Sequence, residues 1–244
     1  MLSLPTLTRV FALSIAGIGI LQFIFRQVLI GRPAALIDNT NITTALAFIV
    51  GIVLVLCAIK LWMRSSATTL LFATAIFVFV FSGLSNLYIV ISQGDYGGVL
   101  TSFGKSITLG SALILYAQII AGYKLSRPFN LCRICLGLFL AISGVQHFLF
   151  VDFVKFLVPS WIPFNVFWTY VAGVALIGTG LSLLLNVRIK VIAQLGGWMV
   201  FAWFLVLHIP RAFSEPNTSE LPAVFESLAV SAILFTLSRL AKEK

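Results

Sequence analysis

The chain contains little charge and few acidic residues. Only 9% of its 244 residues are charged, and Asp and Glu together number seven. A soluble domain carries about 25% charged residues, so the composition excludes an ordinary soluble fold. Hydrophobic residues make up 60% of the chain, and the mean hydropathy is +1.10. These values predict a protein embedded in a lipid bilayer.

Cysteine is also scarce, with only Cys57, Cys132 and Cys135. An odd number of cysteines without a loop-rich framework argues against a disulfide scaffold. Cys132 and Cys135 form a Cys-x-x-Cys pair, which is compatible with thiol chemistry or with simple packing in a helix. We favour packing, because no strand context accompanies the pair and no histidine is near. We expect no metal site there.

Basic residues outnumber acidic ones, and the formal net charge is +9. Nucleic-acid-binding proteins gather such charge into a basic stripe or helix, whereas the 16 Lys and Arg residues here are dispersed. We therefore exclude nucleic acid as a partner. The excess of positive charge instead indicates loops on the cytoplasmic side of a membrane.

Long apolar runs predict eight membrane-spanning helices and an all-α, polytopic fold. Their expected limits are Val10–Ile30, Thr44–Met63, Thr68–Ile91, Leu100–Tyr123, Leu131–Phe150, Phe164–Leu185, Ile189–Ile209 and Ala223–Leu240.

The charges sort to the two ends of these spans. The side that holds both chain termini carries 11 of the 16 basic residues, and the other side carries six of the seven acids. Basic residues prefer cytoplasmic loops, so both termini are expected in the cytoplasm. An even number of spans requires the same arrangement.

The two halves of the chain are similar in sequence. Gly51 and Leu54 fall on Gly173 and Leu176 at a shift of 122 residues. At a shift of 125, the sequence GILQFIF from Gly19 lies over GVQHFLF. The pattern predicts two tandem four-helix bundles, residues 1–124 and 125–244, as a parallel internal repeat.

The positions that differ between the halves are informative. His147 falls on Gln22, and His208 falls on Asn86. An amide donates and accepts hydrogen bonds, but only histidine also changes charge near neutral pH. We therefore expect proton chemistry in the second half, with His147 and His208 as the candidate catalytic residues.

Three charged residues are expected beside the histidines at the outer ends of the helices. They are Asp152, Arg211 and Glu226. Arg211 would pair with Asp152 or Glu226, which would offset the cost of charge near the hydrocarbon. Two interpretations stay open: a ligand-binding cluster, or ordinary snorkelling and helix capping.

The segment VPSWIPFNVFWTY, Val158–Tyr170, joins the fifth and sixth spans and is rich in proline and aromatic residues. It fits an aromatic belt with a kinked loop. It also fits a lid, in which Trp161 and Trp168 form flat walls for a planar ligand and Tyr170 adds to the binding surface.

The second half resembles the DoxX-like family of bacterial membrane proteins. The resemblance rests on SGVQHFLFVDFVKFLVPSWIPFNVFWTYVAGVALIGTGLSLLL and VFAWFLVLHIPRAF. It covers about half of the chain, and the first half looks like a degenerate copy. It implies small antiparallel four-helix bundles, a bacterial inner (cytoplasmic) membrane, and links to quinone-coupled oxidation of reduced sulfur or to thiol stress.

Two functions follow as hypotheses. In the first, a redox-associated membrane protein binds a quinone-like ligand near the outer face, with a quinone as the expected cofactor and a membrane or periplasmic redox partner. His147 or His208 would move protons, and Arg211 would hold an anionic group. The alternative is a non-enzymatic membrane subunit or a binding protein for a lipid-like molecule.

Overall fold

The structure, a computed structural model, describes residues 2–34, 39–65 and 68–241, and these residues fold into helices without a strand. Eight helical spans in this part of the chain are long and apolar enough to cross a membrane. The expected all-α, multi-pass membrane fold is confirmed. The spans are α1 (Leu4–Phe25), α2 (Thr40–Met63), α3–η1–α4 (Thr68–Gln93), α5 (Gly98–Ala121), α6 (Ser126–Leu149), α8 (Asn165–Leu185), α9–η3–α10 (Ile189–Ser214) and α11 (Glu220–Leu240).

Two of the spans are composite. The third consists of α3 (Thr68–Phe77), the π-helix η1 (Val78–Leu84) and α4 (Ser85–Gln93), and the seventh of α9 (Ile189–Trp203), the π-helix η3 (Phe204–His208) and α10 (Ile209–Ser214). Between α6 and α8, the chain adds the short helix α7 (Val151–Val154) and the 3₁₀ turn η2 (Lys155–Leu157).

The first span begins and ends earlier than its sequence predicts. Ser3 starts it, because the Ser3 side chain accepts a hydrogen bond from the Thr6 N–H. Arg26 ends it in a left-handed conformation, with φ of 55°. The apolar residues Leu29 and Ile30, expected as the end of the helix, instead lie buried in the following loop. Because these buried residues are apolar, they extend the apolar run from which the span was predicted.

The seventh span runs past its expected end at Ile209. Pro210 ordinarily disfavours continuation of a helix, since proline lacks an N–H and clashes with the preceding turn. The wide π-turn of η3 precedes Pro210, and helix α10 continues to Ser214. A π-turn interrupts the regular hydrogen-bond ladder, so the helix can accept the proline there.

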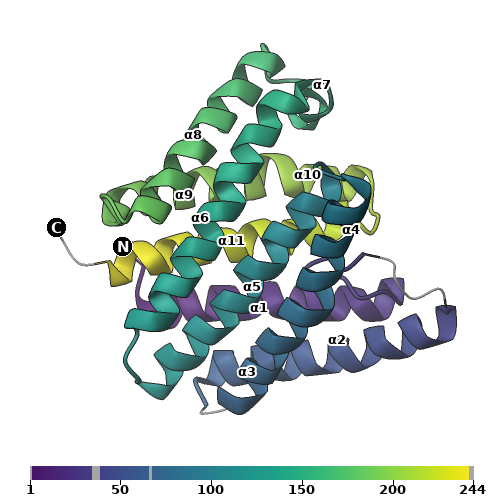
Figure 1. Ribbon diagram of the computed structural model, residues 1–244, viewed down its shortest axis with the longest axis vertical. Coiled ribbons are helices and arrows are strands. Elements are labelled where there is room, and N and C mark those ends of the chain that lie inside the picture. The colour runs from purple at the N-terminus through teal and green to yellow at the C-terminus, as the bar shows by residue number, and fades with distance from the viewer. Residues whose placement is uncertain (1, 35–38, 66–67, 242–244) are drawn as a thin grey trace.

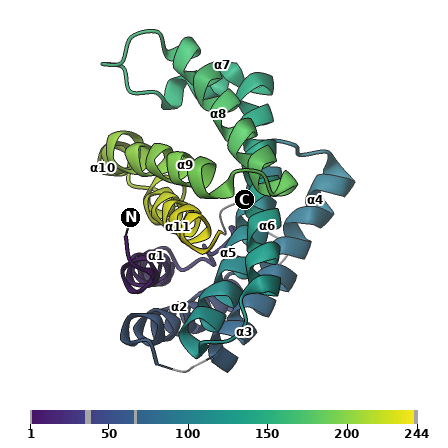
Figure 2. The same cartoon turned by 90° about the vertical axis from the view of Figure 1, so that its left-hand side faces the viewer.

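The helices of the two halves are interlocked. The most extensive contacts pair α1 with α2 and α6 with α8, and α11 lies against both α9 and α1 (Figures 1 and 2). Helix α5 packs against α6. The first helix of each half thus lies beside the last helix of the other half. Helices α1 and α11 are the most buried of the spans.

Glycine contacts support the internal repeat. A methyl group on Gly19 would lie 3.1 Å from the carbonyl oxygen of Gly51, where α1 crosses α2. The matching residues, Gly144 and Gly173, meet where α6 crosses α8, and the corresponding distance is 2.7 Å. Glycines permit this close approach of helix backbones. The division into two repeats stays a prediction, which these matched contacts favour.

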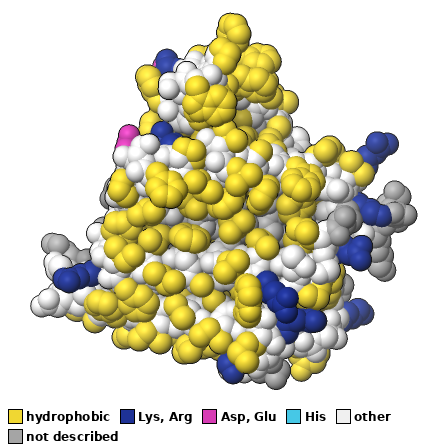
Figure 3. All heavy atoms as spheres, turned by 180° about the vertical axis from the view of Figure 1, so that it is seen from behind, with side chains coloured by type: hydrophobic (Ala, Val, Ile, Leu, Met, Phe, Trp, Pro, Cys, Tyr) yellow, Lys and Arg dark blue, Asp and Glu magenta, His cyan; other side chains and the backbone are white. Residues whose placement is uncertain are grey.

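Charge is distributed unevenly over the surface. In the space-filling view, most visible Lys and Arg side chains gather toward the side where both chain ends lie (Figures 1 and 3). Three residues counted in the charge asymmetry, Asp38, Lys242 and Lys244, lie outside the described residues. We call the side with the chain ends the basic face.

Candidate functional site

A hollow of about 390 Å³ contains both histidines of the chain. It lies between α6, α8, α9 and η3, and the segment from Val154 to Ile162 closes one side. We call it the histidine pocket. Its wall is mostly apolar and consists of His147, Val154, Leu157, Val158, Pro159, Ile162, Trp168, Thr169, Val171, Ala172, Met199, Trp203, Val206, Leu207 and His208.

The two imidazoles differ in their surroundings. His147 lies in the last turn of α6, and its Nδ1 lies 2.7 Å from the Ser143 carbonyl oxygen. A carbonyl only accepts, so Nδ1–H donates and Nε2 of the neutral ring remains an acceptor. His208 ends η3, and its Nδ1 is buried without a hydrogen-bond partner in the described structure. Each ring therefore keeps one nitrogen without a hydrogen-bond partner in the described part of the chain.

The aromatic residues predicted to bind a ligand are divided by the structure. Trp168 lines the histidine pocket, whereas Trp161 and Tyr170 do not. Trp161 is 71% exposed, and Tyr170 stacks on Phe148 with 5.3 Å between ring centroids. Trp203 is a pocket aromatic that sequence reasoning missed. It is the last residue of α9, immediately before η3, and only the packing of α9 against α8 brings it to the site.

Glu226 belongs to a separate buried ion cluster. It is 4% exposed and accepts hydrogen bonds from Arg32 Nε and Nη2 at 3.0 and 2.8 Å. Lys105 Nζ lies 2.7 Å from the same carboxylate. The expected pairing of Arg211 with Glu226 is therefore wrong. Arg32 and Lys105 both come from the first half, so the cluster joins the two halves.

Arg211 pairs with Glu220 instead. Its Nη2 and Nε lie 2.6 and 3.1 Å from the two Glu220 carboxylate oxygens. This bidentate pair ties α10 to the first turn of α11. Arg211 Nη1 also reaches the Phe156 carbonyl oxygen at 3.5 Å. Arg211 thus borders the segment that closes the histidine pocket but does not line the pocket.

Asp152 lies at the surface, where it pairs with Lys155 at 2.7 Å. The Lys155 ammonium lowers the pKa of the Asp152 carboxyl. The expected pairing of Asp152 with Arg211 is wrong, because each residue has a nearer partner of opposite charge. The five polar residues expected in one cluster therefore separate. The two histidines line the pocket, Glu226 lies in the buried ion cluster, Arg211 pairs with Glu220, and Asp152 pairs with Lys155 at the surface.

Sequence reasoning missed Arg32, Lys105 and Glu220 as members of the polar region. Lys105 gave a signal, because it lies within a span and an intramembrane cation requires a partner. His208 is close enough to interact electrostatically with Lys105, Glu226 and Glu220. The ion pairs and the histidine pocket therefore form adjoining parts of one polar region.

The first half positions Arg32 with a buried loop. Gly31 has φ of 66°, a left-handed conformation that glycine adopts easily. The Gly31 carbonyl accepts hydrogen bonds from Asn86 Nδ2 at 3.0 Å and Ser106 Oγ at 2.9 Å. Ser82 Oγ donates to the Ile30 carbonyl at 2.8 Å. Asn86, which matches His208 in the repeat, thus holds the loop that carries Arg32 to Glu226.

A second hollow occupies the matching place in the first half. Its wall includes Phe77, Phe81 and Leu84, which match Met199, Trp203 and Val206 of the histidine pocket at a shift of 122. No histidine lines it. The fold thus presents two related hollows, and only the one in the second half has imidazoles.

Comparison with known proteins finds one family match and assigns no activity. Residues 136–233 match the family described as Domain of unknown function (DUF8561). The match contains every residue that lines the histidine pocket, as well as Glu220 and Glu226, but neither Arg32 nor Lys105. No curated protein and no solved structure matches the chain.

Proposed function

We propose that the protein binds an amphipathic, quinone-like ligand in the histidine pocket and takes part in membrane redox chemistry. The observation that carries the proposal is that both histidines of the chain line one mostly apolar hollow with Trp168 and Trp203. Its volume of about 390 Å³ falls in the range of small-molecule sites.

The pocket residues suit a planar ring with oxygen atoms at opposite edges. Indole rings such as those of Trp168 and Trp203 pack against flat aromatic groups. His147 Nε2 and the unpaired nitrogen of His208 supply hydrogen bonds to ring oxygens. Interconversion of a quinone and its quinol transfers two protons and two electrons. We assign the proton transfer to the two imidazoles and the electron transfer to the redox partner.

The neighbouring ion cluster adds a favourable field. Arg32 and Lys105 carry two positive charges, and Glu226 carries one negative charge, which leaves a net charge of +1. Lys105 and Glu226 of this cluster lie close enough to His208 to interact with it electrostatically. A fixed positive charge in a region of low dielectric stabilises negative charge that develops on a ligand oxygen.

The resemblance to the DoxX-like family supports the same class of function. On this basis we place the protein in the bacterial inner membrane and propose a membrane or periplasmic partner that exchanges electrons with the ligand. The basic face and both termini would lie in the cytoplasm. The histidine pocket, at the opposite ends of the spans, would then lie near the periplasmic face.

A second candidate is a non-enzymatic subunit or binding protein for a lipid-like molecule. The apolar wall of the histidine pocket favours it, because most of the lining residues offer only van der Waals contact. In this case the histidines orient a ligand and transfer no proton. The two candidates predict different behaviour for variants that keep a hydrogen-bonding side chain but remove the titratable group.

The test is to purify the protein in native lipid and to quantify the quinone that is bound. The decisive variant is His147→Gln/His208→Asn, which installs the amides of the first half. Asp152→Asn is the matched control, since Asp152 lies outside the pocket. The proposal expects bound quinone in the wild type and the control, and a loss of about tenfold or more in binding or turnover in the double variant.

Other outcomes of this experiment separate the two candidates. A double variant that retains ligand but loses redox turnover supports proton transfer by the histidines. A double variant that retains both ligand and redox turnover overturns the redox proposal. A wild-type protein that carries an apolar lipid and no quinone also overturns it, and the lipid-binding protein then remains as the candidate.

A further inference from the structure

The histidine pocket lies between two spans that diverge. Helix α8 and the span α9–η3–α10 spread apart from the turn that joins them toward their outer ends (Figures 1 and 2). Closer to that turn the helices touch, because a methyl group on Gly196 would lie only 2.8 Å from Thr179 Cγ2. Farther along the same spans, Val171 of α8 and Val206 of η3 both line the hollow. The hollow therefore occupies the space that opens between the diverging spans.

One side of the pocket reaches the molecular surface. Trp168, Val171 and Val206 line the hollow and are also 47%, 40% and 37% exposed. Thr169, another lining residue, is buried. A side chain that both borders a hollow and is exposed marks the rim of an opening. The pocket thus opens between α8 and η3, and we call Trp168, Val171 and Val206 the lateral rim.

The lateral rim lies where a lipid bilayer surrounds the protein. All three of its residues belong to membrane-spanning segments. The exposed residues Val174 and Leu205, on the same two spans, are apolar as well. None of the described residues that line the pocket is Asp, Glu, Lys or Arg. An apolar and uncharged rim within a span is suited to contact with lipid rather than with water.

The outer end of the pocket is covered by the segment that joins α6 to α8. Val154, Leu157 and Val158 of this segment are half-buried and line the hollow. Arg211 Nη1 lies 3.5 Å from the Phe156 carbonyl oxygen and connects the same segment to α10. The pocket is therefore covered at its outer end and open toward the lipid.

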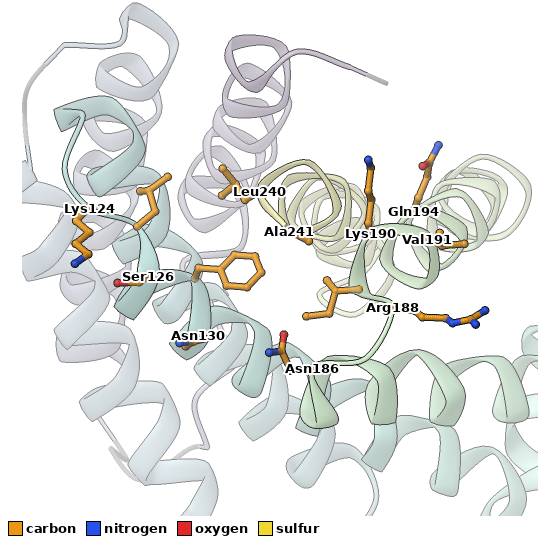
Figure 4. Close-up of a pocket in the computed structure, with 13 residues that line it drawn as sticks. Lys124, Ser126, Asn130, Asn186, Arg188, Lys190, Val191, Gln194, Leu240 and Ala241 are labelled. Atoms are coloured by element: carbon orange, nitrogen blue, oxygen red, sulfur yellow. The ribbon is translucent and has the colours of Figure 1, made fainter. Parts of the chain in front are cut away.

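The hollow at the basic face has a different lining. Its volume is about 940 Å³, and it lies between the start of α6, the turn that joins α8 to α9, and the end of α11 (Figure 4). Lys124, Arg188 and Lys190 line it, and their side chains point in different directions (Figure 4). Charged side chains suit a position beside headgroups and water. The contrast supports a position of the lateral rim beside hydrocarbon.

We propose that the ligand of the histidine pocket enters sideways from the bilayer and carries an apolar chain that leaves the pocket between Val171 and Val206. This inference rests on the proposed function, because it takes a quinone-like ring as the occupant of the pocket. A hollow of about 390 Å³ suits a ring and the start of a chain. The rest of a long chain lies in the lipid, which avoids the cost of exposing methylene groups to water.

The first test compares two ligands that differ only in the chain, decyl-benzoquinone and methyl-benzoquinone, with the protein in phosphatidylcholine nanodiscs. Val171→Phe/Val206→Phe, the rim variant, narrows the opening. Val174→Phe/Leu205→Phe is the matched control, because these residues are exposed on the same spans but do not line the pocket. We expect the rim variant to bind the decyl compound about fivefold more weakly than the wild type, and the methyl compound within about twofold. The control should bind both compounds like the wild type.

A second measurement does not depend on quinone binding. The probe is a phosphatidylcholine that carries a photoreactive diazirine in one acyl chain. After irradiation in nanodiscs, mass spectrometry of peptides should find label on the buried Thr169 in the wild type and in the control, and less label in the rim variant. Equal thermal unfolding of the three proteins shows that the rim variant is folded.

The outcomes separate this inference from the proposed function. Label on Thr169 without binding of either quinone overturns the proposed function and leaves the lateral opening. A rim variant that binds the decyl compound as tightly as the wild type, or that loses both compounds equally, overturns the inference. Equal losses in the rim variant and the control contradict it as well, and so does a wild-type protein whose Thr169 takes up no label.

Discussion

Individual side chains at the outer ends of the helices fall into two groups. His147, His208 and Trp168 line a hollow, whereas Arg211 and Glu226 connect segments of the chain through ion pairs. The two groups require different experiments, because loss of an ion pair is expected to change stability before it changes ligand binding.

Replacing Glu226 by Gln is expected to destabilise the protein strongly. The change leaves Arg32 and Lys105 without a negative partner at a buried site, for which the cost is about 3–5 kcal/mol. Unfolding of the purified protein in mixed detergent measures the effect. The double variant Glu226→Gln/Lys105→Met removes one of the two orphaned cations and should recover part of the loss. Equal stability of the two variants would contradict this account.

Replacing Arg211 by Gln is expected to have a smaller effect on stability and none on ligand retention. Arg211 pairs with Glu220 and does not line the histidine pocket, and a partly exposed pair contributes about 1 kcal/mol. Combining it with Glu220→Gln should cost less than the sum of the two single changes. A loss of ligand with unchanged stability would instead support the anion-binding role that the sequence predicts for Arg211.

The sequence indicated only part of the polar region at the outer ends of the helices, because it missed Arg32, Lys105 and Glu220. The amide-to-imidazole differences at His147 and His208 pointed to the second half, and the structure places both rings in one hollow. Their catalytic role stays a prediction. The partners of Glu226 were missed because Arg32 reaches it through a buried loop, and hydropathy reads that loop as helix.

The spans themselves were easier to predict from the sequence than the residues at which they end. The apolar runs predicted all eight spans, since the bilayer sets their length and composition. Their ends were less predictable. The left-handed Arg26 ends α1 within an apolar run, and η3 carries the seventh span through Pro210. Neither hydropathy nor proline position reports such local backbone geometry.

The close crossing of α6 and α8 can be tested by substitution of a glycine at the contact. A methyl group on Gly144 would lie 2.7 Å from the Gly173 carbonyl oxygen, so Gly144→Ala should force the helices apart and cost about 1–3 kcal/mol. Gly178→Ala is the control. Gly178 lies on α8, like Gly173, but no atom of another segment lies within 4 Å of the added methyl group. We expect the free energy of unfolding of the control to equal that of the wild type or to be slightly higher. Equal effects would show that the close crossing is absent.

In the whole molecule, the first helix of each half packs against the last helix of the other half, and we call this arrangement the exchange of helices between halves. The repeat predicted two tandem bundles of four, residues 1–124 and 125–244, and this division stays a prediction. The structure places α1 beside α11 and α5 beside α6. Tyr116 of α5 lies at the centre, where its ring stacks on Phe11 and its hydroxyl lies 2.8 Å from Thr236 Oγ1.

A cysteine pair distinguishes the exchanged arrangement from closed bundles. The Phe225 ring of α11 covers Gly17 of α1, so Gly17→Cys/Phe225→Cys should form a disulfide under mild oxidation. The background should lack Cys57, Cys132 and Cys135, which are buried free thiols. Mobility on non-reducing gels, after cleavage of an engineered site between the halves, reports the bond. Halves that separate would contradict the exchange.

The pairing of α1 with α11 also determines when the protein can assemble in the cell. Of the eight spans in the described residues, α1 is synthesised first and its partner α11 last. During synthesis the face of α1 that carries Gly17, which the Phe225 ring covers in the finished protein, must remain in contact with lipid or with an insertion factor. A chain truncated before α11 would keep that face uncovered, and we expect membrane quality-control proteases to degrade it even though every earlier span is inserted.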